Sequence, residues 1–275
     1  MITFARTRWS YDSYTDFWKL VELSGYPICY VDEMDLGDKS QLYIMAPMNG
    51  ELSPYIDDYR AKQGSVQAQI YLWNLERPSG SGGLNNYAND NERHKSGGYI
   101  HKTIVSDPEL AITNSFVYVP MGGHPELGEP GTLDNKEYDL IHLACFSYRR
   151  GFMFHTPSDP KAILGTFSVA RNCWGNERHK CLKASRIMLN IHQDEDKFIE
   201  PLRFVLAAAY GLPIVSEHTS KSIYDEFIVH TPLHGMFNTM RNILDDYPSY
   251  YMHVGLPFRE YLNNNNFRTL LEGHI

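Results

Sequence analysis

The sequence predicts an α/β protein built from two Rossmann-like domains. The length of 275 residues suits two domains of roughly 130 residues each. Short, continuous apolar runs alternate with amphipathic stretches, and the alternation occurs once over residues 1–135 and again over 136–256. Such alternation is typical of parallel, doubly wound sheets, whose strands are buried on both faces.

Six apolar runs predict the strands of the first domain, because each ends at a polar residue or at Gly or Pro. The runs are ITFAR (2–6), ICYVDE (28–33), QLYIMAP (41–47), AQIYLWNLE (68–76), HKTIVSD (101–107) and SFVYVP (115–120). Amphipathic stretches at 14–24 and 54–63 predict helices between them.

Residues 78–98 interrupt this pattern. They are rich in Gly, Ser and Asn and show no periodicity, so we expect a long loop, which in a compact domain is usually functional or disordered. Residues 122–131, which begin Gly-Gly-His-Pro and end Pro-Gly, are expected to connect the two domains.

The second half repeats the alternation more regularly. Its expected strands are YDLIHLACF (138–146), ILGTFSVA (163–170), RIMLNIH (186–192), LPIVSE (212–217) and FIVHTP (227–232). Helices are expected at 199–210 and 236–247, and a last helix at 257–273 with an Asn-rich interruption.

The net charge of −8 argues against a protein that coats nucleic acid by bulk electrostatics, although it leaves room for a local basic groove. The chain contains no run of about 18 apolar residues, so we expect no membrane span. Its N-terminus lacks the apolar segment and cleavage site of a signal peptide, which predicts a cytoplasmic location.

We predict no metal site. The four cysteines are too few and too scattered for a disulfide framework, and Cys173, His179 and Cys181 match no zinc spacing. Asp194–Asp196 has the form of a D-x-D metal motif, but it lies on a polar loop before a helix and is interpreted as solvated.

Residues 186–217 carry the clearest chemical pattern. A buried strand ends at Asn190–His192, a helix begins near Glu200 and Arg203, and the next strand ends at Glu217. Ligands of open α/β sheets bind beyond the carboxyl ends of the strands, so these side chains should gather at one edge. An arginine and a helix N-terminus favour a diphosphate, and a carboxylate suits ribose hydroxyls. The alternative is that Glu200 only complements the helix dipole and Arg203 is a surface charge.

This stretch resembles the donor-binding domain of GT-B glycosyltransferases, especially the CgeB-like and "glycosyl transferases group 1" branch. The shared features are a strand ending L-N-I-H, a helix with an arginine that ends at Gly211, and a following V-S-E strand. FSYRR (146–150) and WGNER (174–178) match upstream segments of that family in the same order, and we expect Arg149 and Arg178 to face the ligand.

The resemblance implies two Rossmann-like domains that face each other across a cleft, without a metal. The donor, by expectation a UDP-sugar, would bind the C-terminal domain and the acceptor the N-terminal domain, on which the tail at 257–275 would pack. The chain departs from the family's pair of glutamates eight positions apart, because Phe198 and Leu206 occupy those positions. This departure leaves the ribose contact and the stereochemical outcome open.

The catalytic base is expected in the N-terminal domain. Asp32 and Glu33 end one strand there, but Glu76 and Asp107 are preferred because each ends an apolar strand near the long loop. The alternative for each acid is a structural role as a helix cap or a charge partner.

The expected function is therefore transfer of a sugar from a nucleotide-diphosphate donor to an acceptor hydroxyl, with no separate cofactor. The acceptor would be a glycan, a small molecule or a modified DNA base of the phage type. Arg77, Arg93, His94 and Lys95, in and beside the long loop, would meet phosphates in the DNA case. A non-catalytic nucleotide- or sugar-binding protein and a nucleotide-sugar epimerase are the alternatives, and the oligomeric state is left open.

Overall fold

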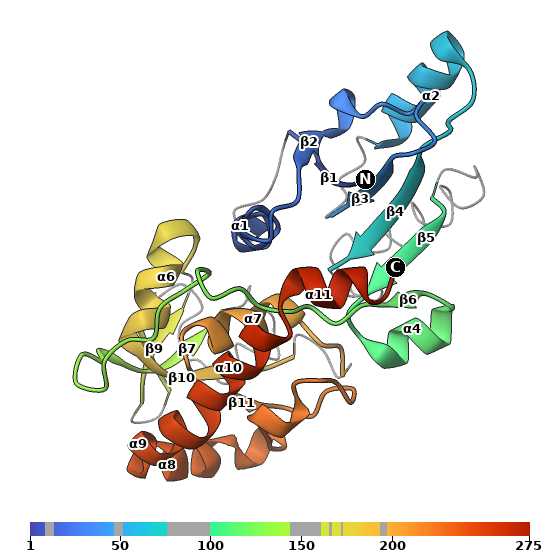
Figure 1. The fold of residues 1–275 in the computed structure, drawn as a ribbon. Helices are drawn as coiled ribbons and strands as arrows, with labels where there is room; N and C mark the ends of the chain where they lie inside the picture. The colour runs from blue at the N-terminus through green and yellow to red at the C-terminus, as the bar shows by residue number, and fades with distance from the viewer. Residues whose placement is uncertain are drawn as a thin grey trace. The chain divides into compact units, whose positions relative to one another are not determined.

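The computed structural model describes residues 1–8, 14–46, 52–75, 100–143, 161–164, 167–171, 173–192 and 197–275. Contacts within the chain divide it into two units, Met1–Val119 with Glu272–Ile275, and Pro120–Leu271. Each unit contains a sheet of parallel strands flanked by helices (Figure 1), so the structure confirms the mixed α/β class and is consistent with two Rossmann-like domains.

The first sheet is parallel throughout, with the strand order β2-β1-β3-β4-β5-β6. Its elements are β1 (Ile2–Arg6), α1 (Thr15–Leu23), β2 (Ile28–Tyr30), β3 (Leu42–Met45), α2 (Leu52–Gln63), β4 (Gln69–Asn74), β5 (Lys102–Val105), α4 (Pro108–Asn114) and β6 (Val117–Tyr118). A single 3₁₀ turn, Val31–Glu33, follows β2.

Aromatic rings hold the first sheet against α1. Phe4 of β1 lies 6.1 Å from Phe17 of α1 and 6.5 Å from Trp73 of β4, measured between ring centroids. All three side chains are fully buried. Rings of this size contribute much of a domain's core energy. This cluster joins α1 to β1 and β4, which lie two positions apart in the sheet.

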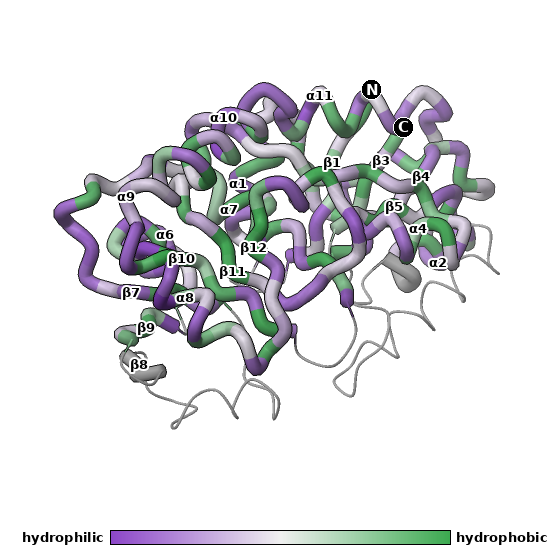
Figure 2. Tube along the Cα trace, turned by 90° about the horizontal axis from the view of Figure 1, so that it is seen from below, coloured by the Kyte–Doolittle hydropathy of each residue, from purple (hydrophilic) through white to green (hydrophobic). Residues whose placement is uncertain are grey.

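The second sheet has the order β12-β11-β10-β7-β9-β8, and all its strands are parallel except β8. Its elements are β7 (Tyr138–His142), β8 (Lys161–Leu164), β9 (Phe167–Arg171), α6 (Gly175–Ala184), β10 (Ser185–Asn190), α7 (Pro201–Ala209), β11 (Ile214–Ser216), β12 (Ile228–His230), α8 (Met236–Asp245), α9 (Tyr247–Tyr250), α10 (Leu256–Asn264) and α11 (Phe267–Glu272). Figure 2 shows hydrophobic residues along β11, in keeping with a strand buried on both faces.

The predicted strand 163–170 is wrong as a single strand. β8 and β9 are antiparallel neighbours, with Ile163 paired to Ser168, so the chain reverses inside the apolar run. Both arms are apolar because they belong to the same sheet, and in the sequence only Gly165-Thr166 separates them.

The two units share one topology. When β8 is set aside, both sheets read second-first-third-fourth-fifth strand, so the chain changes direction across the sheet between β1 and β3 and between β7 and β10. Ligands of open α/β sheets bind at this switch point, beyond the carboxyl ends of the strands. A ligand site in the second unit is therefore expected at the carboxyl end of β10.

Helix α7 begins and ends as its sequence predicts. Pro201 is its first residue, where a missing N–H costs nothing, and Gly211 follows it in the left-handed conformation at φ 64°. Gly211 N donates to Ala208 O (2.9 Å) and Leu212 N to Ala207 O (2.9 Å), which is the Schellman pattern. These bonds fix α7 between the ends of β10 and the start of β11.

The segment from Pro120 to Lys136 groups with the second unit, whereas the sequence predicted a boundary at 135/136. Its glycines explain the grouping, because a side chain at Gly128 would collide with the ring of Tyr210 behind α7. Arg259 of α10 donates to Gly128 O (2.8 Å), and α10 itself packs on α7 (Figure 1). Only the last residues of the predicted tail, Glu272–Ile275, group with the first unit.

Candidate functional site

Polar side chains gather at the carboxyl edge of the second sheet. The register places Asn190 of β10 opposite Ser216 of β11, and Ser216 opposite His230 of β12. All three are the last residues of their strands. The sheet therefore ends in a polar row beside the switch point, and the loops after these strands add further polar groups.

Arg203 connects α7 to this row. Its guanidinium Nη1 donates to Asn190 Oδ1 (3.0 Å) and also contacts the carboxylate of Glu200. The Arg203 side chain is 14% exposed and that of Glu200 28%, so the ion pair is partly buried at the rim of the site. Asn190 is fully buried and directs its Nδ2 to Ser216 Oγ (2.9 Å). The amide thus fixes the arginine from the strand side.

Glu217 and His192 form the second half of the site. Glu217 Oε2 accepts the backbone N–H of His192 (2.9 Å), and Glu217 N donates to Asn190 O (3.2 Å). Both side chains are buried. The Glu217 carboxylate therefore joins the loops that follow β10 and β11.

His192 is held as a neutral imidazole. Its Nε2 lies 3.0 Å from the carbonyl oxygen of His218, which can only accept, so Nε2 carries the proton. Burial lowers the pKa of His192 from its usual 6.5, and the bond to His218 O only partly offsets this effect. At neutral pH the positive charge of this edge therefore comes from Arg203.

Sequence reasoning missed two histidines beside this cluster. The rings of His218 and His230 stack 5.6 Å apart with an interplanar angle of 12°, and His230 Nε2 lies 3.8 Å from Asp225 Oδ1. The same rule that found Glu217 could have found both, because His218 follows the predicted strand 212–217 and His230 ends β12.

The five residues predicted around β10 and β11 are brought together by the structure. They are Asn190, His192, Glu200, Arg203 and Glu217. One guanidinium, two carboxylates and a neutral imidazole surround the start of a helix. Such a set can bind a ligand that carries both an anionic group and hydroxyls, because the cation suits the first and the carboxylates the second.

Arg178 lies elsewhere on the same sheet edge, in the first turn of α6 after β9. It is buried, donates from Nε to Cys173 O (3.4 Å), and its guanidinium carbon lies 5.1 Å from the centroid of Trp174. Since β7 separates β9 from β10 in the sheet, Arg178 is in a different position from the Arg203 cluster. Arg149, the other predicted cation, lies outside the described residues.

The structure gives Asp107 a capping role. Asp107 follows β5 and precedes α4, and its Oδ1 accepts the backbone N–H of Leu110 (2.9 Å) with the side chain only 2% exposed. This is the helix-cap alternative that the sequence left open. Glu76, the other predicted base, lies outside the described residues.

Within the described ranges, no three His, Cys, Asp or Glu side chains come close enough to hold a metal ion. Cys173 and Cys181 do come together, with their sulfur atoms 2.6 Å apart and both as free thiols. No helix in the described part of the chain is long and apolar enough to cross a membrane.

Comparison with models of protein families finds no match to this chain, and a search of curated proteins finds none either.

Proposed function

We propose that the protein is a metal-independent glycosyltransferase of the GT-B type, which moves a sugar from a nucleotide-diphosphate donor to an acceptor hydroxyl. The observation that carries the proposal is the Arg203–Asn190–Glu200 cluster at the switch-point edge of the second sheet. In this proposal the second unit binds the donor, with a UDP-sugar expected, and the first unit binds the acceptor, a glycan, a small molecule or a modified DNA base. The GT-B cleft between the units is part of the proposal.

The chemistry assigned to the cluster follows from its charges. Arg203 and the amino end of α7 would stabilise the negative charge that builds on the departing diphosphate. Glu200 would accept hydrogen bonds from ribose hydroxyls once the ligand takes over Arg203. A base in the first unit would remove the proton of the acceptor hydroxyl. Glu76 is the better candidate, since Asp107 is buried and its carboxylate caps the start of α4.

A non-catalytic nucleotide- or sugar-binding protein is the second candidate. The structural role of Asp107 favours it, because this acid caps the start of α4 and is only 2% exposed, so an acceptor hydroxyl would have little access to it. Both candidates predict nucleotide binding at the second unit, so turnover separates them.

The test is a thermal-shift and calorimetric screen of UDP-, GDP-, ADP- and TDP-sugars, with Arg203→Gln and Glu200→Gln beside the wild type. Arg241→Gln on α8 is the matched control, since Arg241 is exposed and lies outside the cluster. We expect one nucleotide to raise the melting temperature of the wild type and of the control, but not that of Arg203→Gln. Release of free sugar during long incubation would favour the enzyme, and binding without release the second candidate.

Glu200→Gln gives a sharper outcome. Removal of this carboxylate frees the Arg203 guanidinium, so inorganic pyrophosphate should bind this variant more tightly than the wild type. The affinity for the nucleotide sugar should rise less than that for pyrophosphate, or fall, since the ribose hydroxyls lose the Glu200 carboxylate as an acceptor. If no nucleotide shifts the wild type, the donor-site proposal for this cluster is wrong.

A further inference from the structure

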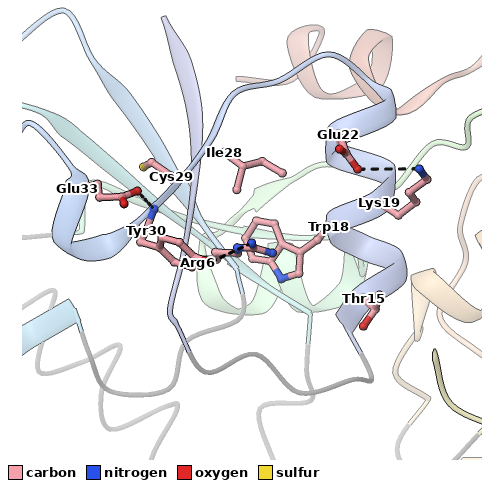
Figure 3. Close-up of a pocket in the computed structure, with 9 residues that line it drawn as sticks. All are labelled: Arg6, Thr15, Trp18, Lys19, Glu22, Ile28, Cys29, Tyr30 and Glu33. Carbon is pink, nitrogen blue, oxygen red and sulfur yellow. Dashed lines mark hydrogen bonds and ion pairs between the residues drawn. The ribbon is translucent and has the colours of Figure 1, made fainter. Parts of the chain in front are cut away.

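The first unit contains a cavity of about 390 Å³ between α1 and the edge strand β2. Figure 3 shows its lining, in which Arg6 and Tyr30 approach from the sheet, and Trp18 and Glu22 from the helix. Arg6 and Tyr30 are the last residues of β1 and β2, so the cavity opens at the carboxyl edge of the first sheet. The volume lies at the small end of the range for ligand pockets and suits a molecule of monosaccharide size.

Arg6 is held in the cavity by aromatic rings. Its guanidinium carbon lies 5.9 Å from the centroid of Trp18 and 5.1 Å from that of Tyr30, and Nη2 donates to the Tyr30 hydroxyl over 3.3 Å. Cation–π contacts fix the plane of an arginine but leave its full charge and most of its N–H donors in place. Among the described residues Arg6 has no ion-pair partner.

The carboxylates that line the cavity are engaged with other groups. Glu33 accepts the backbone N–H of Tyr30 (2.9 Å) and lies 3.7 Å from Arg8, and Glu22 lies 4.0 Å from Lys19. Arg8, two residues after Arg6, makes short bonds of 2.9–3.0 Å with both oxygens of Asp32. One of the two neighbouring arginines is therefore neutralised by acids, and the other faces the cavity with its charge uncompensated.

A second donor lies beside Arg6. The indole of Trp18 is only 5% exposed, and its Nε1 is buried without a hydrogen-bond partner in the described structure. An orphaned buried donor is costly, which is a reason to expect that something accepts it in the working protein. The indole and the guanidinium lie against each other in Figure 3, so one oxygen-rich group could serve both.

We propose that this cavity is a binding site for a small organic anion of monosaccharide size, whose carboxylate or phosphate is held by Arg6 and Trp18 Nε1. An anion supplies what the lining lacks, since it neutralises the guanidinium and accepts the free indole N–H. Within the proposed function the ligand would be an acceptor that carries an acidic group, but the site itself does not depend on sugar transfer.

The experiment is isothermal titration calorimetry on the full chain with three probes, glucuronate, glucose 6-phosphate and neutral glucose. We expect at least one of the two anions to bind the wild type more tightly than glucose. Arg6→Gln should weaken that binding tenfold or more, which is the usual worth of a charge-assisted hydrogen bond. Trp18→Phe keeps an aromatic ring at this position but removes the indole N–H, and should weaken anion binding several-fold.

Two controls make the result specific. Arg8→Gln removes a neighbouring positive charge that is paired with Asp32 outside the cavity lining, and should leave the affinity within about twofold. Arg203→Gln should also leave it unchanged, which separates this site from the proposed donor site of the second unit. Circular dichroism checks that each variant folds, and Arg6→Met, which keeps a long side chain and removes the charge, replaces Arg6→Gln if the latter does not fold.

The proposal fails on any of three results. Neither anion binds better than glucose, or Arg6→Gln binds the anion as the wild type does, or Arg8→Gln loses as much affinity as Arg6→Gln. Intact anion binding in Arg203→Gln would support this site, whether or not the wild type binds a nucleotide sugar.

Discussion

Lys136, which precedes β7, is a buried ammonium whose cost can be worked out from the structure. The residue is 9% exposed, and its Nζ donates to the carbonyl of Lys183 (2.9 Å). Burial lowers the pKa of Lys136 from 10.5 to about 8, and repulsion from Arg186 and Lys183 adds to the effect. Since each pKa unit is worth 1.36 kcal/mol, the charged form costs the fold about 3 kcal/mol.

The sign follows from the order of the two pKa values. Above pH 10.5 the Lys136 side chain is a neutral amine in both the folded and the unfolded chain. Between pH 10.5 and 8 the unfolded chain binds a proton at Lys136 that the folded chain does not. The free energy of unfolding therefore rises with pH across this window and falls as the pH drops through 8. From pH 7 to 9.5 the contribution of this one group is an increase of about 2 kcal/mol.

The perturbation is Lys136→Met, which keeps a long apolar side chain and removes the titrating group. Urea unfolding at pH 7, 8 and 9.5, followed by circular dichroism, gives the free energy of unfolding of each protein. The wild type should gain about 2 kcal/mol more than Lys136→Met between pH 7 and 9.5. Lys180→Met on α6 is the control, because Lys180 is 74% exposed and should show no such difference.

Parallel curves for the wild type and Lys136→Met would refute the reasoning. They would mean that the pKa of Lys136 lies near its ordinary value and that water reaches the ammonium in solution. A difference of opposite sign would be equally damaging, because it would require an acid partner that raises the pKa of Lys136.

Three further predictions follow from other contacts. Oxidised glutathione should take two electrons from the Cys173–Cys181 pair, forming a disulfide and two glutathione thiols. A trypsin digest should then show a cross-linked peptide pair that disappears on reduction, and its absence in oxidised wild type would contradict the prediction. Gly255→Ala would push a methyl group into the carbonyl of Gly211 and should lower the free energy of unfolding by about 3 kcal/mol in urea titrations, whereas an unchanged midpoint would show that this close approach is absent. Burial lowers the pKa of His192 below 6.5, so wild-type stability should fall as the pH drops from 7 to 5, and His192→Gln should lose less in the same melting assay.

The strands were predictable because a buried parallel strand consists of a short, continuous run of apolar residues. The run 2–6 coincides with β1, and the proline and glycine that bound α7 mark its ends within a residue or two. The β8–β9 reversal was missed because its mark in the sequence is slight, with only Gly165-Thr166 between the two apolar arms. The contacts that tie residues 120–136 to α10 also connect positions far apart in sequence, and composition says nothing about them.

The membership of the cluster was predictable in part, and its pairing was not. Strand ends locate Asn190 and Glu217, because the carboxyl ends of parallel strands share an edge. The bond from Arg203 to Asn190 depends on the rotation of α7 about its axis, which apolar spacing fixes only coarsely. The cavity around Arg6 was missed for a related reason, because the flanking Trp18 and Tyr30 belong to separate elements whose proximity only the fold creates.

The ion pair between Arg203 and Glu200 affects which ligands can bind at this site. The Arg203 guanidinium is already bonded to Glu200 and Asn190, so an incoming phosphate must compete with the Glu200 carboxylate. A ligand of phosphate alone would displace Glu200 from Arg203, at a cost comparable to a lost charged hydrogen bond. A ligand with hydroxyls beside its phosphates can give Glu200 a new donor as it takes over the arginine. Under the proposed function, Glu200 would favour a nucleoside diphosphate over inorganic phosphate, and Glu200→Gln should remove that preference while it strengthens the binding of the bare anion.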